Sequence, residues 1–158
     1  MTFDEALAKY PTLCATGFGI SNFKPQPTHA EALRRLEADR EELRTLRRTE
    51  IAIASAYLWR CQPTVTARQH SYYLKHRAEA WAIVDGERSY VSNGALITAA
   101  LLADLVVRPC EPRALRLRDL GSCDPNAWVG VSKRSVDMLI TRSHSRHTPV
   151  SSESRGIH

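Results

Sequence analysis

The chain has 158 residues, 43% of them hydrophobic and 25% charged, and its 22 Lys and Arg against 17 Asp and Glu give a net charge of +5. This length suits one domain with a single core, and the composition excludes a wholly disordered chain and a disulfide-stabilised miniprotein. The longest nearly apolar stretch, residues 95–107, is shorter than the roughly 20 residues that a membrane span needs. Because no signal peptide is readable at the N-terminus, we expect a cytoplasmic protein without a membrane partner.

The first segment begins with a capping box. Thr2 and Glu5 stand in the Ser/Thr-x-x-Glu pattern that starts helices, which predicts a short helix ending before Pro11. Glycines and prolines then break the periodicity of residues 16–27, as is typical of a surface loop. We therefore interpret residues 1–27 as a lead-in to the domain.

A second capping box, Thr28 to Glu31, is followed by no Gly or Pro before Pro63. This predicts one long helix over residues 29–61, about 50 Å in length. Its first half is strongly charged and its second half is apolar. Such a helix is longer than a domain of this size can cover, so part of it should project into solvent or contact a partner. A homodimer formed through this helix is one possibility. A thin apolar seam follows its charged half: Leu33, Leu36, Leu43 and Leu46.

The next helix is predicted over residues 66–84, with a cap at residues 66–69 or at Ser71 as alternatives for its start, and it is amphipathic. One side is apolar and should face the core. The opposite side carries basic and hydrogen-bonding groups, and we expect it on the surface. Its members are Arg68, Tyr72, Lys75, His76 and Glu79.

A third helix should start after the cap residue Ser92 and extend over residues 93–107. Apolar residues occupy nearly its whole circumference, which predicts that it is the central helix. Ile97 and Leu101 lie one turn apart on it and should both be buried.

Beyond Pro112 the hydrophobic period changes. Residues 114–120 alternate leucine with arginine, which predicts a half-buried strand, and residues 128–131 are its expected partner in a hairpin. The fold class is therefore mainly α: a single helical domain over residues 28–140 with a small C-terminal β-hairpin, for which a winged-helix-like arrangement is an alternative. A short last helix should end near Ile140, and the basic Ser-, Arg- and His-containing residues 141–158 should be a disordered tail.

The sequence offers little support for catalysis or a cofactor. His76 and Glu79 are spaced to share a metal or a proton, but two ligands are fewer than a zinc site takes, and no nucleophile motif accompanies them. We therefore predict no catalytic residue, no metal ligand and no cofactor. The cysteines follow neither zinc nor redox spacing, so free thiols are expected, with a metal site assembled from distant residues as the alternative: Cys14, Cys61, Cys110 and Cys123.

The basic side of the 66–84 helix favours a noncatalytic protein that binds nucleic acid, because a phosphate backbone needs positive and hydrogen-bonding groups on one exposed face. The hairpin arginines could act as a wing. A solvated basic face without a ligand would look the same, and a protein-binding accessory or inhibitor using the long charged helix is the competing hypothesis. The predicted nucleic-acid contacts are Arg68, Tyr72, Lys75, His76, Arg116 and Arg118.

Three strings in the second half of the chain form a recognisable pattern: SYYLKHRAE at residues 71–79, YVSNGALI at 90–97 and PNAW at 125–128. This pattern resembles one that recurs in small uncharacterised bacterial proteins, some of them associated with plasmids or phages. The resemblance carries no activity. It implies a bacterial accessory protein of a mobile element, and it favours interaction with nucleic acid or a host protein over metabolism.

Overall fold

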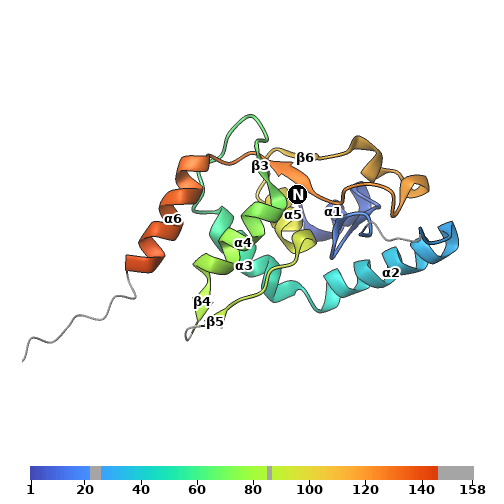
Figure 1. The fold of residues 1–158 in the computed structure, drawn as a ribbon, viewed down its shortest axis with the longest axis horizontal. Coiled ribbons are helices and arrows are strands. Elements are labelled where there is room, and N and C mark those ends of the chain that lie inside the picture. The colour runs from blue at the N-terminus through green and yellow to red at the C-terminus, as the bar shows by residue number, and fades with distance from the viewer. Residues whose placement is uncertain (22–25, 85–86, 146–158) are drawn as a thin grey trace, which may run out of the picture.

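The computed structural model describes residues 1–21, 26–84 and 87–145 (Figure 1). Within them the fold is mainly helical, with small antiparallel sheets, as predicted. The α-helices are α1 (Phe3–Lys9), α2 (His29–Thr45), α3 (Arg48–Leu58), α4 (Ser71–Trp81), α5 (Asn93–Leu102) and α6 (Lys133–Ser145). The strands and 3₁₀ helices are β1 (Leu13–Cys14), β2 (Gly17–Phe18), β3 (Gln69–His70), β4 (Ile83–Val84), β5 (Glu87–Arg88), β6 (Val107–Pro109), η1 (Pro112–Leu115), η2 (Leu117–Asp119) and β7 (Ala127–Val129).

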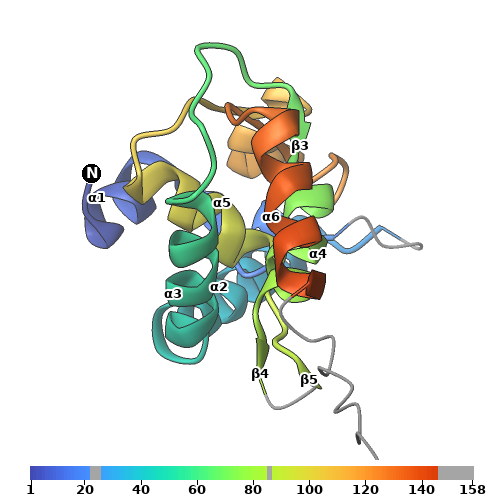
Figure 2. The ribbon, with the colours of Figure 1, turned by 90° about the vertical axis from the view of Figure 1, so that its left-hand side faces the viewer.

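Helix α5 is the centre of the molecule, with α1, α3 and α4 around it (Figures 1 and 2). All its residues from Asn93 to Leu101 are buried, which confirms the prediction that this helix is central. Its first turn is capped by the Ser92 hydroxyl, which accepts a hydrogen bond from the Ala95 amide at 3.3 Å. The helix ends earlier than predicted because Asp104 takes a left-handed backbone with a φ of 53°, after which the chain enters β6. No helix in the described ranges is both long and apolar enough to cross a membrane.

The prediction of one long helix over residues 29–61 is wrong, because α2 ends at Thr45 and α3 begins at Arg48. Arg47 leaves the helical conformation, and its guanidinium bonds Glu42 on one side of the break and Glu50 on the other. These ion pairs stabilise a break that no Gly or Pro signals. This chain itself covers only part of the apolar seam: Leu36 packs with Cys14, Ile20 and Leu120, and Leu43 joins the main core, whereas Leu33 and Leu46 are exposed.

The N-terminal segment contributes to the main core. The predicted capping box at Thr2 is present and starts α1. Leu7 of α1, Leu13 of β1 and Phe18 of β2 are all buried in the same cluster as α5. The segment expected as a lead-in therefore packs within the domain.

The largest sheet has three antiparallel strands in the order β3-β7-β6. His70 and Arg108 both lie opposite Trp128 of the central strand, one from each neighbouring strand. Because side chains alternate across a strand, Trp128 points away from the face that Ala127 and Val129 bury against the core. The sheet therefore has a buried inner face and a partly exposed outer face.

The predicted hairpin between residues 114–120 and 128–131 is wrong. Residues 112–119 form η1 and η2, and β7 pairs with β3 and β6 instead. Pro112 starts the first 3₁₀ turn, and the side chain of Leu117 is exposed, so the alternation of leucine and arginine does not mark a buried strand face. The winged-helix-like alternative is not confirmed, since it depended on this hairpin. Helix α6 extends to Ser145, and residues 146–158 of the predicted tail lie outside the described residues.

Candidate functional site

The predicted basic face does not form on a single helix. Helix α4 begins at Ser71, and Arg68 precedes it in an extended segment, where its amide bonds the Val129 carbonyl. The reason is tertiary, because Gln69 and His70 pair with β7 and so cannot be helical. Arg68 is therefore separated from the remaining predicted contacts, which do lie on α4.

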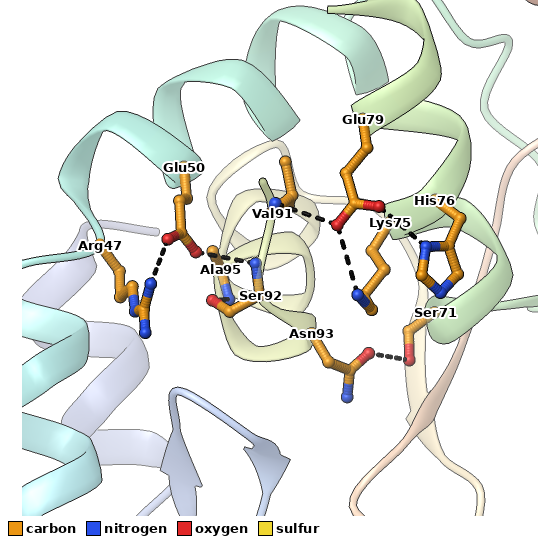
Figure 3. Close-up of polar contacts among 10 residues, drawn as sticks. All are labelled: Arg47, Glu50, Ser71, Lys75, His76, Glu79, Val91, Ser92, Asn93 and Ala95. Carbon is orange, nitrogen blue, oxygen red and sulfur yellow. Dashed lines mark hydrogen bonds and ion pairs between the residues drawn. The ribbon is translucent and has the colours of Figure 1, made fainter. Parts of the chain in front are cut away.

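Lys75 is buried, contrary to the prediction that its side chain lies on the surface. Its side chain is only 9% exposed, and its Nζ lies 3.3 Å from Glu79 Oε1 (Figure 3). The same nitrogen lies 5.1 Å from the ring centre of Tyr72 and 5.3 Å from that of Tyr90. The charge of Lys75 is thus paired with a carboxylate and flanked by two aromatic rings.

Glu79 collects three hydrogen bonds. Besides Lys75, its carboxylate accepts from His76 Nδ1 at 2.8 Å and from the Val91 amide at 3.1 Å (Figure 3). Burial alone raises the pKa of Glu79, but the bonds from Val91 and His76 and the charge of Lys75 outweigh it, so this pKa lies below its ordinary value. The His76 and Glu79 pair therefore has a structural use, since Glu79 holds the chain that enters α5.

Glu50 of α3 holds the backbone at Ser92, the residue after Val91, in the same way. Its carboxylate accepts the Ser92 amide at 2.7 Å and pairs with the guanidinium of Arg47 (Figure 3). Two carboxylates from neighbouring helices, the buried Glu50 and the mostly buried Glu79, thus bind the consecutive amides of Ser92 and Val91. Sequence reasoning missed Glu50, because nothing in its surroundings in the chain distinguishes it from the other acidic residues of this region.

A second polar cluster joins the three strings of the sequence pattern. Ser71 Oγ donates to Asn93 Oδ1 at 2.7 Å and accepts from the Ala127 amide at 3.0 Å. Asn93 Nδ2 in turn donates to the Thr16 carbonyl at 2.9 Å. One residue from each string therefore meets at the start of α5, although these residues are far apart in the sequence.

A cavity of about 330 Å³ opens beside this cluster. All three strings contribute to its wall, together with the β1–β2 turn. Lys75 and Glu79 cancel each other's charge next to it, so the cavity offers aromatic and amide groups rather than a net charge. Its main lining residues are Tyr72, Lys75, Tyr90, Asn93, Pro125 and Asn126.

Unlike this cavity, the outer face of the β3-β7-β6 sheet carries unpaired positive charge among the described residues. We define the outer sheet face as Arg68, His70, Arg108 and Trp128. Arg68 and Arg108 are exposed and line a shallow depression of about 300 Å³. Neither arginine makes an ion pair with any residue in the described parts of the chain. Trp128 is half-buried, and the His70 ring meets it edge-on at 5.1 Å.

The remaining predicted contacts are exposed but scattered. Arg116 lies between η1 and η2, and Arg118 lies in η2 with its Nε 4.0 Å from a carboxylate oxygen of Asp119. Neither residue belongs to a β-wing. Tyr72 and His76 lie on α4 with their rings in edge contact at 4.6 Å, and both are about half exposed.

Comparison with known proteins gives no match to a family model, a curated protein or a solved structure. The site is therefore interpreted from its geometry. Sequence reasoning missed Arg108 and the role of Trp128, since only strand pairing brings them beside Arg68. The sequence held one signal of a role for Trp128, namely its position in the third string of the pattern.

Proposed function

We propose that this chain is a noncatalytic cytoplasmic accessory protein of bacterial origin that binds nucleic acid, and that its contact surface is the outer sheet face. One observation carries the proposal: two exposed arginines, Arg68 just before β3 and Arg108 on β6, lie on either side of Trp128, and neither makes an ion pair within the described residues. The contact surface is thus moved from the α4 helix, where the sequence analysis put it, to the sheet beside it.

The chemistry of these groups fits a single strand of nucleic acid. A guanidinium presents paired N–H donors that match the oxygens of a phosphate, and an indole offers a flat surface on which a base can stack. A shallow sheet face with cations beside an aromatic ring tracks a strand whose bases are exposed, whereas reading a duplex groove needs a protruding helix or ribbon. Single-stranded DNA or RNA is therefore the ligand that this face favours.

Two of the original candidates support this surface less directly. Arg116 and Arg118 follow β6 in the chain and are exposed, so they could extend the basic surface beyond Arg108. Lys75 is left out of the proposal because Glu79 neutralises it. The net charge of +5 is small and by itself gives little support for binding nucleic acid. The support comes from the local grouping of arginines that have no acidic partner among the described residues.

The test is fluorescence anisotropy with labelled single-stranded DNA, single-stranded RNA and duplex DNA over a range of salt concentrations. The double variant Arg68→Ala, Arg108→Ala should bind more weakly. Two lost phosphate contacts should reduce the slope of log affinity against log salt by about 1.4 units. The control is the double variant Arg34→Ala, Arg44→Ala on the exposed side of α2, which removes the same charge elsewhere and should keep the slope of the wild-type chain.

Three results would overturn the proposal. If the wild-type chain binds none of the three probes at low salt, the competing hypothesis of a protein partner on charged helix α2 is favoured. If both double variants reduce the slope of log affinity against log salt by the same amount, binding depends on the total charge of the chain and not on the outer sheet face. A loss confined to an Arg116→Ala, Arg118→Ala variant would instead place the contact after β6.

A further inference from the structure

Three side chains with metal-binding atoms meet at the edge of the outer sheet face. They are His70 of β3, Cys110 directly after β6, and Asp124 in the loop before β7. One ligand atom from each lies within 4.8 Å of the other two, and all three residues are half-buried. Their wide separation in the sequence explains why no motif announces them.

The backbone around this cluster is held by its own bonds. The Cys110 amide donates to the Asn126 carbonyl at 2.9 Å, which continues the pairing of β6 with β7. Asp124 is fixed from two sides: its amide donates to Glu111 Oε1 at 3.1 Å, and its Oδ1 accepts the Asn126 amide at 2.9 Å. The edge contact with Trp128 positions the His70 ring. The three ligand residues are therefore supported by neighbours, as ligands of metal sites usually are.

The binding atoms themselves are free. In the described part of the chain, neither the ring nitrogens of His70 nor the Cys110 sulfur makes a hydrogen bond, and the bonds of Asp124 leave its Oδ2 open. Three donor atoms of types that metals bind, within 4.8 Å of one another and without hydrogen bonds in the described part of the chain, are what a metal site requires.

We propose that His70, Cys110 and Asp124 bind one Zn²⁺ ion and leave its fourth position open. A thiolate, an imidazole and a carboxylate suit zinc, whereas Mg²⁺ and Ca²⁺ prefer oxygen ligands alone. Tetrahedral zinc with bonds of about 2.0 to 2.3 Å needs ligand atoms about 3.3 to 3.8 Å apart, so small side-chain rotations close the site. Three protein ligands leave one position for water or for a donor atom of a bound molecule.

The experiment uses the full chain, first loaded with Co²⁺ as a spectroscopic substitute and then titrated with Zn²⁺ against a chromogenic chelator. We expect one equivalent of metal, a thiolate-to-cobalt charge-transfer band, and displacement of Co²⁺ by Zn²⁺. Cys110→Ser should abolish the band, and both Cys110→Ser and Asp124→Asn should weaken Zn²⁺ binding at least about tenfold. Circular dichroism of each variant checks that the fold is kept.

Two controls separate this site from other donors. Cys123→Ser removes a nearby buried thiol and should leave the band and the affinity unchanged. A second control is a triple variant of the C-terminal histidines, which should also leave the cobalt band and the zinc affinity unchanged. Its substitutions are His144→Ala, His147→Ala and His158→Ala. The proposal fails if the wild-type chain binds no Zn²⁺, if the cobalt spectrum lacks the thiolate band, or if folded Cys110→Ser binds as tightly as wild type. Because the readout is metal binding, this outcome is independent of whether the chain binds nucleic acid.

Discussion

The entry of α5 and the outer sheet face are both rich in charged residues, but they use them in opposite ways. At the entry of α5, Lys75 is paired with Glu79 and Arg47 with Glu50. On the outer sheet face, Arg68 and Arg108 have no ion-pair partner among the described residues. The first region uses charge to hold the backbone, and the second leaves the charge of both arginines without an ion pair among the described residues, which is why we propose that it binds a ligand.

The contrast shows that basic residues close together in a sequence need not share a surface. Arg68 and Lys75 are seven positions apart, yet one is exposed on the sheet and the other is enclosed by aromatic rings. A buried cation without a counter-ion is costly, so the fold that buries Lys75 must also supply Glu79. The charge available for binding depends on such pairing and not on the number of basic residues.

The largest expected effect is that of Gly94→Ala, at the tight contact between α5 and the β1–β2 turn. A Cβ at this position would overlap the carbonyl oxygen of Cys14 and lie 2.7 Å from that of Ala15. Neither backbone oxygen can move without shifting the turn. We expect a loss of at least about 4 kcal/mol in the free energy of unfolding, measured by urea denaturation, although Gly to Ala inside a helix ordinarily stabilises.

Gly19→Ala is the matched control. Its φ is +97°, but the nearest atom to an added Cβ would be 3.7 Å away, so only backbone strain remains. That strain costs of order 1 to 3 kcal/mol. If both variants lose equally, close approach at Gly94 is not what makes the entry of α5 rigid.

Leu101→Ala tests the core below that entry. Leu101 is buried at the centre of the molecule, so its loss should lower the free energy of unfolding by about 2 to 5 kcal/mol. Leu33→Ala on α2, where the leucine is 37% exposed, should cost about 0.5 kcal/mol or less. A wild-type urea midpoint for Leu101→Ala would show that α5 is not central.

Lys75→Ala and Arg68→Ala compare the two regions directly. Removing Lys75 leaves the Glu79 carboxylate without its cation in a mostly buried place, which should cost about 1 to 3 kcal/mol in urea denaturation. Removing exposed Arg68 should change stability by no more than about 0.5 kcal/mol. Equal stability losses would mean that the ion pair of Lys75 contributes nothing, and a loss of anisotropy binding for Lys75→Ala alone would return the contact to α4.

The smallest effect is the acid dependence that Glu79 contributes. The folded-state pKa of this carboxyl lies below its ordinary value of 4.5. Its stabilisation is therefore complete above about pH 4.5 and is lost as the pH falls through the folded-state pKa. Glu79→Gln lacks this dependence, so the difference in unfolding free energy between wild type and variant should shrink below pH 4.5. Parallel curves over the whole acid range would contradict the prediction.

The sequence by itself determined the features that depend on near neighbours in the chain. The capping boxes at Thr2 and Thr28 and the Ser92 cap are all present, because each is completed by a residue three positions away. The central place of α5 was also predictable, since a helix that is apolar around its circumference has to be covered on all sides. A mainly helical fold followed from these signals.

Tertiary structure alone decided the rest. A strand near residues 128–131 was predicted, but its partners were not: residues 127–129 pair with 107–109 and with Gln69 and His70, two strands too short to carry a readable pattern. The break at Arg47, the burial of Lys75 and the meeting of His70 with Cys110 likewise depend on partners outside their own segments. No local sequence pattern indicates contacts between segments far apart in the chain. The energy of such contacts depends on strand register and on burial, and both are set only when the chain folds.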